Sequence, residues 1–156
     1  MTFVEKTTDP TKLRRWRGNI EADYIYTSGI AGEKFFKELT RSGKLMATHC
    51  PRCDLTYLPP RMYCERCLVE AKEWREVPPV GQVEAFTVSR QDEEGSELLT
   101  PEVWALIRFP DIHGGFVHRL SVPPEKVKAG MKVRPRLKSQ PDRTGEITDI
   151  MFFEPV

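Results

Sequence analysis

The sequence predicts a mainly β protein in three parts: an N-terminal helix, a small hairpin unit and a C-terminal five-stranded barrel. Three observations carry this prediction. They are an apolar helical period that ends at a glycine, two matching pairs of cysteines, and an almost continuous β pattern from residue 80 onward. The predicted boundaries are 1–43 for an arm and the helix, 44–77 for the hairpin unit, and 78–156 for the barrel.

Composition limits the kind of protein before any motif is considered. The chain has 156 residues, 39% of them apolar and 30% charged, which is enough to bury a core without disulfide support. Its net charge of +1 argues against bulk electrostatic capture of nucleic acid, although a local basic patch stays open. The longest apolar runs are far too short for a membrane span, and no apolar leader follows Met1, so we expect a cytoplasmic protein.

The N-terminal part combines an arm of weak pattern with one clear helix. In the arm, residues 14–17 read Arg-Arg-Trp-Arg, which forms either a solvated segment or an anchor on a partner, because Trp and Arg are preferred at interfaces. The helix is expected over 31–42. Phe35 and Leu39 lie four residues apart on one face, and Gly43 follows as a natural stop.

The cysteines are the most informative feature of the chain. They form two Cys-x-x-Cys pairs separated by ten residues, at Cys50, Cys53, Cys64 and Cys67. Two such turns supply four thiolates for one tetrahedral site, which favours a structural Zn²⁺ with no open position for water. Two disulfides, a redox dithiol and an iron site in an electron carrier are the alternatives. His49 abuts the first ligand and either competes for the metal or is an ordinary residue at a strand end or surface.

The segment around the cysteines is expected to form a zinc ribbon. Residues 55–63 are long enough for a strand, a turn stiffened by prolines and a return, and short strands are expected at 44–49 and 73–77. Turns of this kind often have glycine after the second cysteine, where φ is positive, but here Asp54 and Leu68 occupy those positions. Since Asp tolerates a positive φ better than Leu does, the second turn is expected to differ in shape.

The rest of the chain predicts a barrel, and the double proline Pro78-Pro79 before it is expected to act as a stiff hinge. A polar loop is expected over 91–102, a hairpin turn at 111–115, and one short helical turn at 123–130. Pro135 indicates an edge or a bulge. The five expected strands cover residues 82–90, 103–110, 116–122, 131–139 and 146–153. Five strands with a small helix between the third and fourth fit an OB-fold.

These motifs together resemble a known family, the acyl-CoA-associated proteins that join an N-terminal helix, a rubredoxin-like zinc ribbon and a C-terminal OB-fold. The resemblance runs roughly from residue 20 to the end and is most specific between Gly43 and Val88. The residues that carry it are 24–29, 35–39, 43–45, the two cysteine pairs, 59–61, Trp74, 81–83 and 86–88. The sequence departs from the family pattern at Asp54 and Leu68, and in having two prolines before Gly81.

The resemblance implies a non-catalytic subunit that binds a thiolase or thiolase-like protein in a hetero-oligomer. In such complexes the small subunit holds the assembly together and helps to form or cover the CoA channel. The resemblance thus implies a required subunit of a heteromeric thiolase, an acyltransferase acting on acyl-CoA, with CoA shared between the subunits.

The residues of this chain give little sign of chemistry of its own. Thiolysis needs a free thiolate and a base, and every cysteine is expected to be committed to metal. No nucleophile elbow, phosphate-binding glycine loop or dinucleotide motif is present. We expect His113 to lie in a turn, His118 to lie in a strand and the acidic run 92–94 to be solvated. No catalytic residue is therefore assigned.

Three residues of the ribbon are candidates for contact with CoA. Arg61 and Tyr63 follow a rigid Pro-Pro, Tyr57 lies nearby, and phosphates and adenine bind cationic and aromatic side chains respectively. The alternative to CoA contact is that the two tyrosines pack within the ribbon and that Arg61 is solvated.

A different class of function is also open, that of a single-stranded nucleic-acid-binding protein, because zinc ribbons and OB-folds both occur in such proteins. Its basic residues would be Arg52, Arg61, Arg66, Lys132, Arg134 and Arg136.

Overall fold

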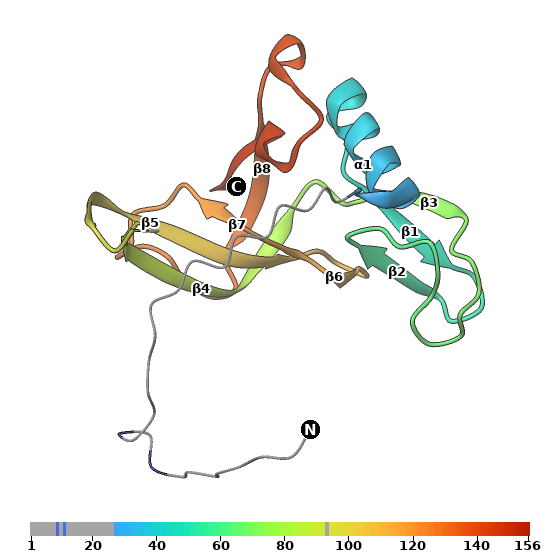
Figure 1. The fold of residues 1–156 in the computed structure, drawn as a ribbon, viewed down its shortest axis with the longest axis horizontal. Helices are drawn as coiled ribbons and strands as arrows, with labels where there is room; N and C mark the ends of the chain where they lie inside the picture. Colours follow the sequence, from blue (N-terminus) through green and yellow to red (C-terminus); the bar gives the residue numbers. More distant parts are fainter. Residues whose placement is uncertain (1–8, 10, 12–26, 93) are drawn as a thin grey trace.

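A helix, a four-stranded sheet and a five-stranded barrel lie side by side in the computed structural model (Figure 1). The structure describes residues 9, 11, 27–92 and 94–156. The arginine-rich arm at 14–17 and the segment 24–26 lie outside the described residues. Within the described part of the chain, no helix has the length and apolar character of a membrane-crossing segment.

Helix α1 (Gly29–Ser42) confirms the helix expected from the apolar period and begins two residues earlier. Ala31, Phe35 and Leu39 form its buried face. Gly43 ends the helix with φ of 71°, and its backbone N–H donates to the carbonyl of Leu39 at 3.0 Å. Glycine adopts this left-handed conformation without the cost that a side chain adds, which is why the helix stops where the sequence predicts.

The zinc-ribbon unit is a four-stranded sheet with one strand that the sequence did not predict. Its strands are β1 (Met46–Cys50), β2 (Leu55–Leu58), β3 (Glu73–Glu76) and β6 (His113–Gly114), in the order β3-β1-β2-β6. Strand β6 comes from the connection between two barrel strands, predicted as a hairpin turn, and pairs in parallel with β2. The backbone N–H of Gly115 donates to the carbonyl of Leu58 at 2.9 Å, so this connection fastens the barrel to the ribbon.

The barrel confirms the predicted five-stranded OB-fold. Its strands are β4 (Gly81–Gln91), β5 (Glu97–Arg108), β7 (Phe116–Leu120), β8 (Lys132–Leu137) and β9 (Ile150–Pro155). They close in the order β4-β5-β7-β9-β8. All neighbouring strands are antiparallel except β7 and β9, which pair in parallel through Leu120 and Phe153.

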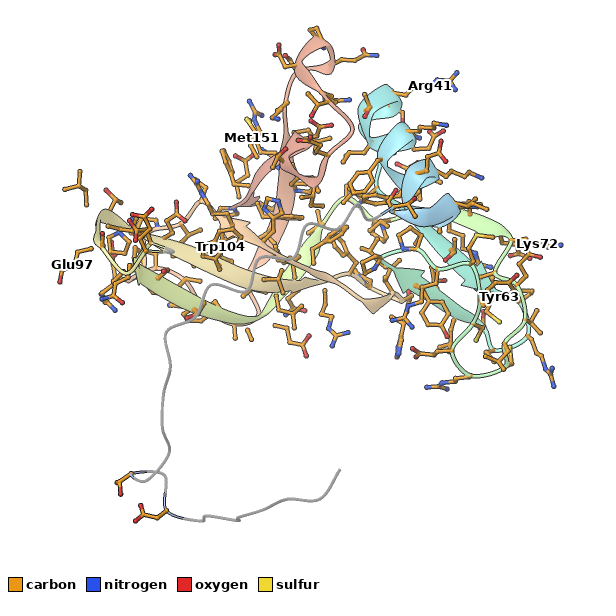
Figure 2. The ribbon with its side chains drawn as sticks, viewed as in Figure 1. Arg41, Tyr63, Lys72, Glu97, Trp104 and Met151 are labelled. Carbon is orange, nitrogen blue, oxygen red and sulfur yellow. The ribbon has the colours of Figure 1, made fainter. Side chains whose placement is uncertain are left out.

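The prediction of a polar loop over residues 91–102 is wrong, because strand β5 already begins at Glu97. A tight turn replaces it: the Asp92 carboxylate accepts the backbone N–H groups of Glu94 and Ser96 at 3.0 and 2.8 Å. Strand β5 tolerates Pro101 because the pairing with β4 is irregular there. The register shifts between Ser89 and Gln91 of β4, which face this part of β5. The resulting β4–β5 hairpin extends away from the ribbon (Figure 1), and Figure 2 shows Glu97 near its tip.

Other local expectations also need correction. Residues 123–130 form turns rather than a helix, with one hydrogen bond of 2.9 Å from the N–H of Lys126 to the carbonyl of Pro123. The last strand starts at Ile150 instead of 146, because a 3₁₀ turn (Ile147–Asp149) precedes it, and another 3₁₀ turn (Gln140–Asp142) follows β8. A register irregularity lies between Arg136 and Leu137, directly after Pro135, as a proline bulge predicts.

One apolar core runs through all three parts of the molecule. It includes residues of the helix, the ribbon and the barrel, and Phe35 of α1 lies against Phe116 of β7 with ring centroids 6.0 Å apart. Val77 is 4% exposed, and its N–H donates to the carbonyl of Leu45 at 2.8 Å. Burial therefore continues up to Pro78-Pro79, so this core opposes the hinge motion expected at the double proline.

Asp149 organises the loop before the last strand. Its side chain is fully buried and accepts the N–H of Thr144 at 3.0 Å and the N–H of Gly145 at 2.8 Å, with the Lys138 ammonium at 3.6 Å. Burial alone raises the pKa of Asp149, but these backbone hydrogen bonds and the Lys138 charge outweigh it and hold the pKa below its ordinary value. The carboxylate is thus the charged centre of this loop.

We predict that Asp149→Asn lowers the free energy of unfolding at pH 7 by about 2 kcal/mol, because an amide cannot accept both N–H groups as a carboxylate does. A lowered folded-state pKa stabilises the protein above the unfolded pKa, and this contribution disappears as the pH falls through the folded pKa. Urea unfolding at pH 7 and at about pH 3 should therefore show the two proteins converging in stability at acid pH. An unchanged difference at both pH values would contradict this role.

Candidate metal centre and its surroundings

The four cysteine sulfurs meet at one end of the ribbon sheet. Cys50 ends β1, Cys53 lies in the turn before β2, and Cys64 and Cys67 lie in the second turn, before β3. The sulfur atoms all lie within 4.8 Å of one another, with Cys50 and Cys64 fully buried and the other two partly exposed. This donor set and spacing fit a structural Zn²⁺ held by four thiolates.

The two cysteine turns share one backbone feature. Asp54 has φ of 54° and Leu68 has φ of 57°, so each turn places a left-handed residue after its second cysteine. The Leu68 N–H donates to the carbonyl of Cys64 at 3.0 Å, which closes the second turn. Leu68 thus adopts the positive φ in spite of the steric cost of its side chain, and a different shape of the second turn stays a prediction.

Tyr57 is part of the sulfur cluster's hydrogen-bonding environment. Its hydroxyl lies 3.2 Å from the Cys64 sulfur and donates to the thiolate, which lowers the pKa of Cys64 to about 6. The same contact raises the pKa of Tyr57 to about 12. The hydrogen bond to Cys67 and burial raise the pKa of Cys53 to about 12. Crowded thiols resist a second negative charge, so full deprotonation of the quartet requires a cation among them.

His49 stays outside this cluster. It is 3% exposed at the end of β1, with its Nδ1 3.1 Å from the Thr56 hydroxyl and its Nε2 3.6 Å from the Asp54 carboxylate. Among the described residues, the group of potential ligand atoms that come together contains only the four cysteines. His49 is thus a strand-end residue, as expected, but a buried one.

The three candidates for CoA contact differ in their accessibility. Tyr57 is 1% exposed and lies beneath Arg61, whose guanidinium is 5.2 Å from the ring centroid. Arg61 is exposed and paired with Glu65 at 2.5 Å. Tyr63 is 59% exposed, and Figure 2 shows it on the ribbon. Only Arg61 and Tyr63 therefore offer surface to a ligand in this conformation.

The remaining polar candidates lie apart from one another in the described part of the chain. His118 is buried in β7, where burial lowers its pKa, and its buried Nδ1 has no hydrogen-bond partner among the residues that the structure describes. His113 packs edge-on against Tyr57 with its Nε2 3.3 Å from Glu65. The basic residues proposed for nucleic-acid binding divide between the ribbon and β8, and Arg134 is ion-paired with Glu154.

Comparisons with known proteins agree with this architecture. Residues 38–73 match a family model described as the ChsH2 rubredoxin-like zinc ribbon domain, and residues 74–138 match the ChsH2 C-terminal OB-fold domain. A search of curated proteins found no significant match.

Two solved structures are similar to this chain. One is a DUF35-family protein of unknown function from Sulfolobus solfataricus, 28% identical, with a TM-score of 0.65 over 82% of this chain and 87% of that one. The other is an Ltp2-ChsH2(DUF35) aldolase, 21% identical, with a TM-score of 0.59 over 89% of this chain and 98% of that one.

Proposed function

Because the chain belongs to the ChsH2 family, we propose that it is a non-catalytic, zinc-binding subunit of a thiolase-type acyl-CoA complex. In this proposal it stabilises the assembly and shapes the CoA-binding site, while the partner performs the carbon–carbon chemistry. The zinc ligands would be Cys50, Cys53, Cys64 and Cys67.

The clustering of all four cysteines is the observation that carries the proposal. A thiolase needs a free thiolate as nucleophile, and every cysteine of this chain lies in one group that fits a closed structural site. The chemistry of a thiolase-type complex would then have to come from another chain. A hetero-complex is supported by the similar structure of the Ltp2-ChsH2(DUF35) aldolase, whose name pairs a ChsH2 protein with a second protein.

The proposal is tested by co-expression with neighbouring thiolase genes, followed by co-purification. Thiolytic activity on acyl-CoA is then measured with both chains and with each chain omitted. We expect a stable hetero-oligomer that is active only when both chains are present. A partner that is fully active and stable alone would leave this subunit without the proposed role.

We further propose that Arg61 and Tyr63 contact CoA within the complex. Both are exposed and lie beside the rigid Pro59-Pro60 segment, where a guanidinium can bind phosphate and a phenol ring can face adenine. Arg61→Ala should weaken acyl-CoA binding to the complex on the order of fivefold while zinc content stays unchanged. Calorimetric titration of the complex with acyl-CoA measures this. Unchanged affinity would count against the assignment.

A further inference from the structure

His118 is a buried polar side chain on the inner face of the barrel. Burial alternates along β7, so that Phe116, His118 and Leu120 are buried, whereas Val117 and Arg119 are exposed. His118 is 9% exposed, and its Nδ1 lacks a hydrogen-bond partner within the described residues. An imidazole in such a place is stable only while it is neutral, because a charged ring would be separated from water.

Two aromatic rings enclose the imidazole. The ring of Phe153 on β9 packs edge-on against it with centroids 5.7 Å apart, and the ring of Trp104 on β5, labelled in Figure 2, lies 6.5 Å away. The indole N–H of Trp104 is directed to the Glu102 carboxylate at 3.3 Å. Neither ring therefore compensates a proton on Nδ1 with a hydrogen-bond acceptor.

The charged groups around His118 do not favour its protonated form either. The acidic side chains of β5, of β9 and of the 3₁₀ turn before it, apart from Glu97 at the hairpin tip, are held by other groups. They are Glu102 with Arg119, Glu154 with Arg134, and Asp149 with Lys138, and beside that turn Glu146 with the Thr148 hydroxyl. Burial lowers the pKa of His118 and the like charge of Arg119 adds to this effect, whereas hydrogen bonding with the backbone of Arg119 and Ile147 only partly offsets it.

His118 lies beside the shortest seam of the barrel, where β7 meets β9. In the described part of the chain this seam consists of one parallel pair, Leu120 with Phe153, and a hydrogen bond of 2.7 Å from the Ser121 N–H to the Phe153 carbonyl. On its other side, β7 pairs with β5 along its whole length, from Phe116 to Leu120. Local opening of a sheet is easiest where the fewest hydrogen bonds close it.

We propose that His118 makes the β7–β9 seam sensitive to acid: protonation of its imidazole opens this seam locally, while the rest of the barrel and the ribbon stay folded. Opening gives the imidazolium access to water and exposes the buried side chains of Leu120 and Phe153. The barrel thus presents additional apolar surface only at acid pH. This inference is independent of the proposed function.

The direction of the pH dependence follows from proton binding. The pKa of His118 in the closed barrel lies below its ordinary value of 6.5, so the open form binds a proton that the closed form excludes. Above about pH 6.5 the ring is neutral in both forms and the seam is fully stable. As the pH falls below this value, the open population should rise by up to about tenfold for each pH unit, until the closed form is protonated as well.

The amide of Ser121 reports the seam directly, because its N–H donates across it. Hydrogen exchange of the full-length, zinc-loaded protein is measured between about pH 7.5 and about pH 5.5, a range in which Asp149 stays ionised. The protection factor, which corrects for the exchange of an unstructured chain, should fall by up to about tenfold at Ser121 between about pH 6.5 and about pH 5.5. Amides paired between β4 and β5 should keep their protection, and the zinc content should stay constant.

Two replacements that cannot titrate separate the charge of the side chain from its shape. His118→Leu and His118→Gln should both make the protection of Ser121 independent of pH, whatever their overall stability. His113→Gln is the matched control, because His113 is a half-exposed histidine outside the seam, and it should keep the wild-type pH dependence. Constant protection of Ser121 in the wild-type protein, or the same decrease in both His118 variants, would overturn the proposal. A parallel loss of protection in β4 and β5 would also contradict it, since the whole barrel would then unfold.

Discussion

Replacing Cys64 by serine is expected to abolish zinc binding and to unfold the ribbon. The Cys64 sulfur is fully buried, accepts the Tyr57 hydroxyl and is the thiol whose pKa is lowered to about 6. A serine hydroxyl stays protonated at neutral pH and is a poor ligand for Zn²⁺. Structural zinc supplies on the order of 10 kcal/mol to small units of this kind, which is comparable to the stability of a whole domain.

Metal analysis and hydrogen exchange measure this outcome. We expect about one zinc per wild-type chain and none in Cys64→Ser, with loss of amide protection over β1, β2 and β3. The barrel should keep protection but lose stability, because Leu45, Ala47 and Leu58 of the ribbon belong to the common core. The visible absorption of the wild-type protein also separates colourless zinc from iron.

His49→Gln is the matched control for this substitution. His49 adjoins Cys50 but lies outside the sulfur cluster, so its replacement should leave the zinc content at one per chain. Retention of zinc by Cys64→Ser, or its loss from His49→Gln, would show that the four-cysteine site is assigned incorrectly.

Gly114→Ala is expected to detach the barrel connection from the ribbon. Gly114 has φ of 100°, and a Cβ built on it would lie 2.0 Å from the carbonyl oxygen of Leu58, a distance that real contacts never show. That oxygen accepts the N–H of Gly115 in the β2–β6 pairing, so it cannot move without breaking the junction. We expect a loss of at least about 3 kcal/mol in the free energy of unfolding, or a fall in melting temperature of more than about 6 °C.

Gly95→Ala isolates the steric part of this effect. Gly95 also has a positive φ, 86°, but a Cβ there would meet no atom of the described residues within 4 Å. Its replacement carries the conformational cost alone, about 1 kcal/mol. Thermal unfolding of both variants, with zinc content unchanged in each, checks the comparison. Equal destabilisation by the two substitutions would mean that the β2–β6 junction can rearrange to accommodate the added Cβ, and it would contradict this prediction.

The features predicted correctly from the sequence are those whose causes lie within a few residues of one another. The Cys-x-x-Cys spacing brings each sulfur pair together, and the apolar period with Gly43 defines the helix. Alternation along the barrel segments was sufficient to predict the five strands and the OB-fold. The boundaries at 91–102 and 146–149 were missed because the Asp92 turn and the Asp149 loop depend on side-chain hydrogen bonds that periodicity does not reveal.

The surroundings of the metal centre could be predicted less well. Tyr57 was a candidate for ligand contact because it is aromatic and close in sequence to Arg61, but its hydroxyl faces the Cys64 sulfur and its ring is buried. No local signal distinguishes a tyrosine that supports a metal site from one that faces solvent. Leu68 is costly in a left-handed position, and only the structure shows that it adopts a φ of 57° there with 77% of its surface exposed.

A helix, a four-cysteine ribbon and a five-stranded barrel are predictable from the amino-acid sequence alone, because propensity, periodicity and ligand spacing act over short stretches of chain. How these parts join becomes visible only in the folded molecule. Residues 113–114 become a strand beside β2, more than 50 positions earlier in the chain, and Phe35 packs against Phe116. Such contacts depend on the packing of the whole core, which brings together residues that no local pattern relates.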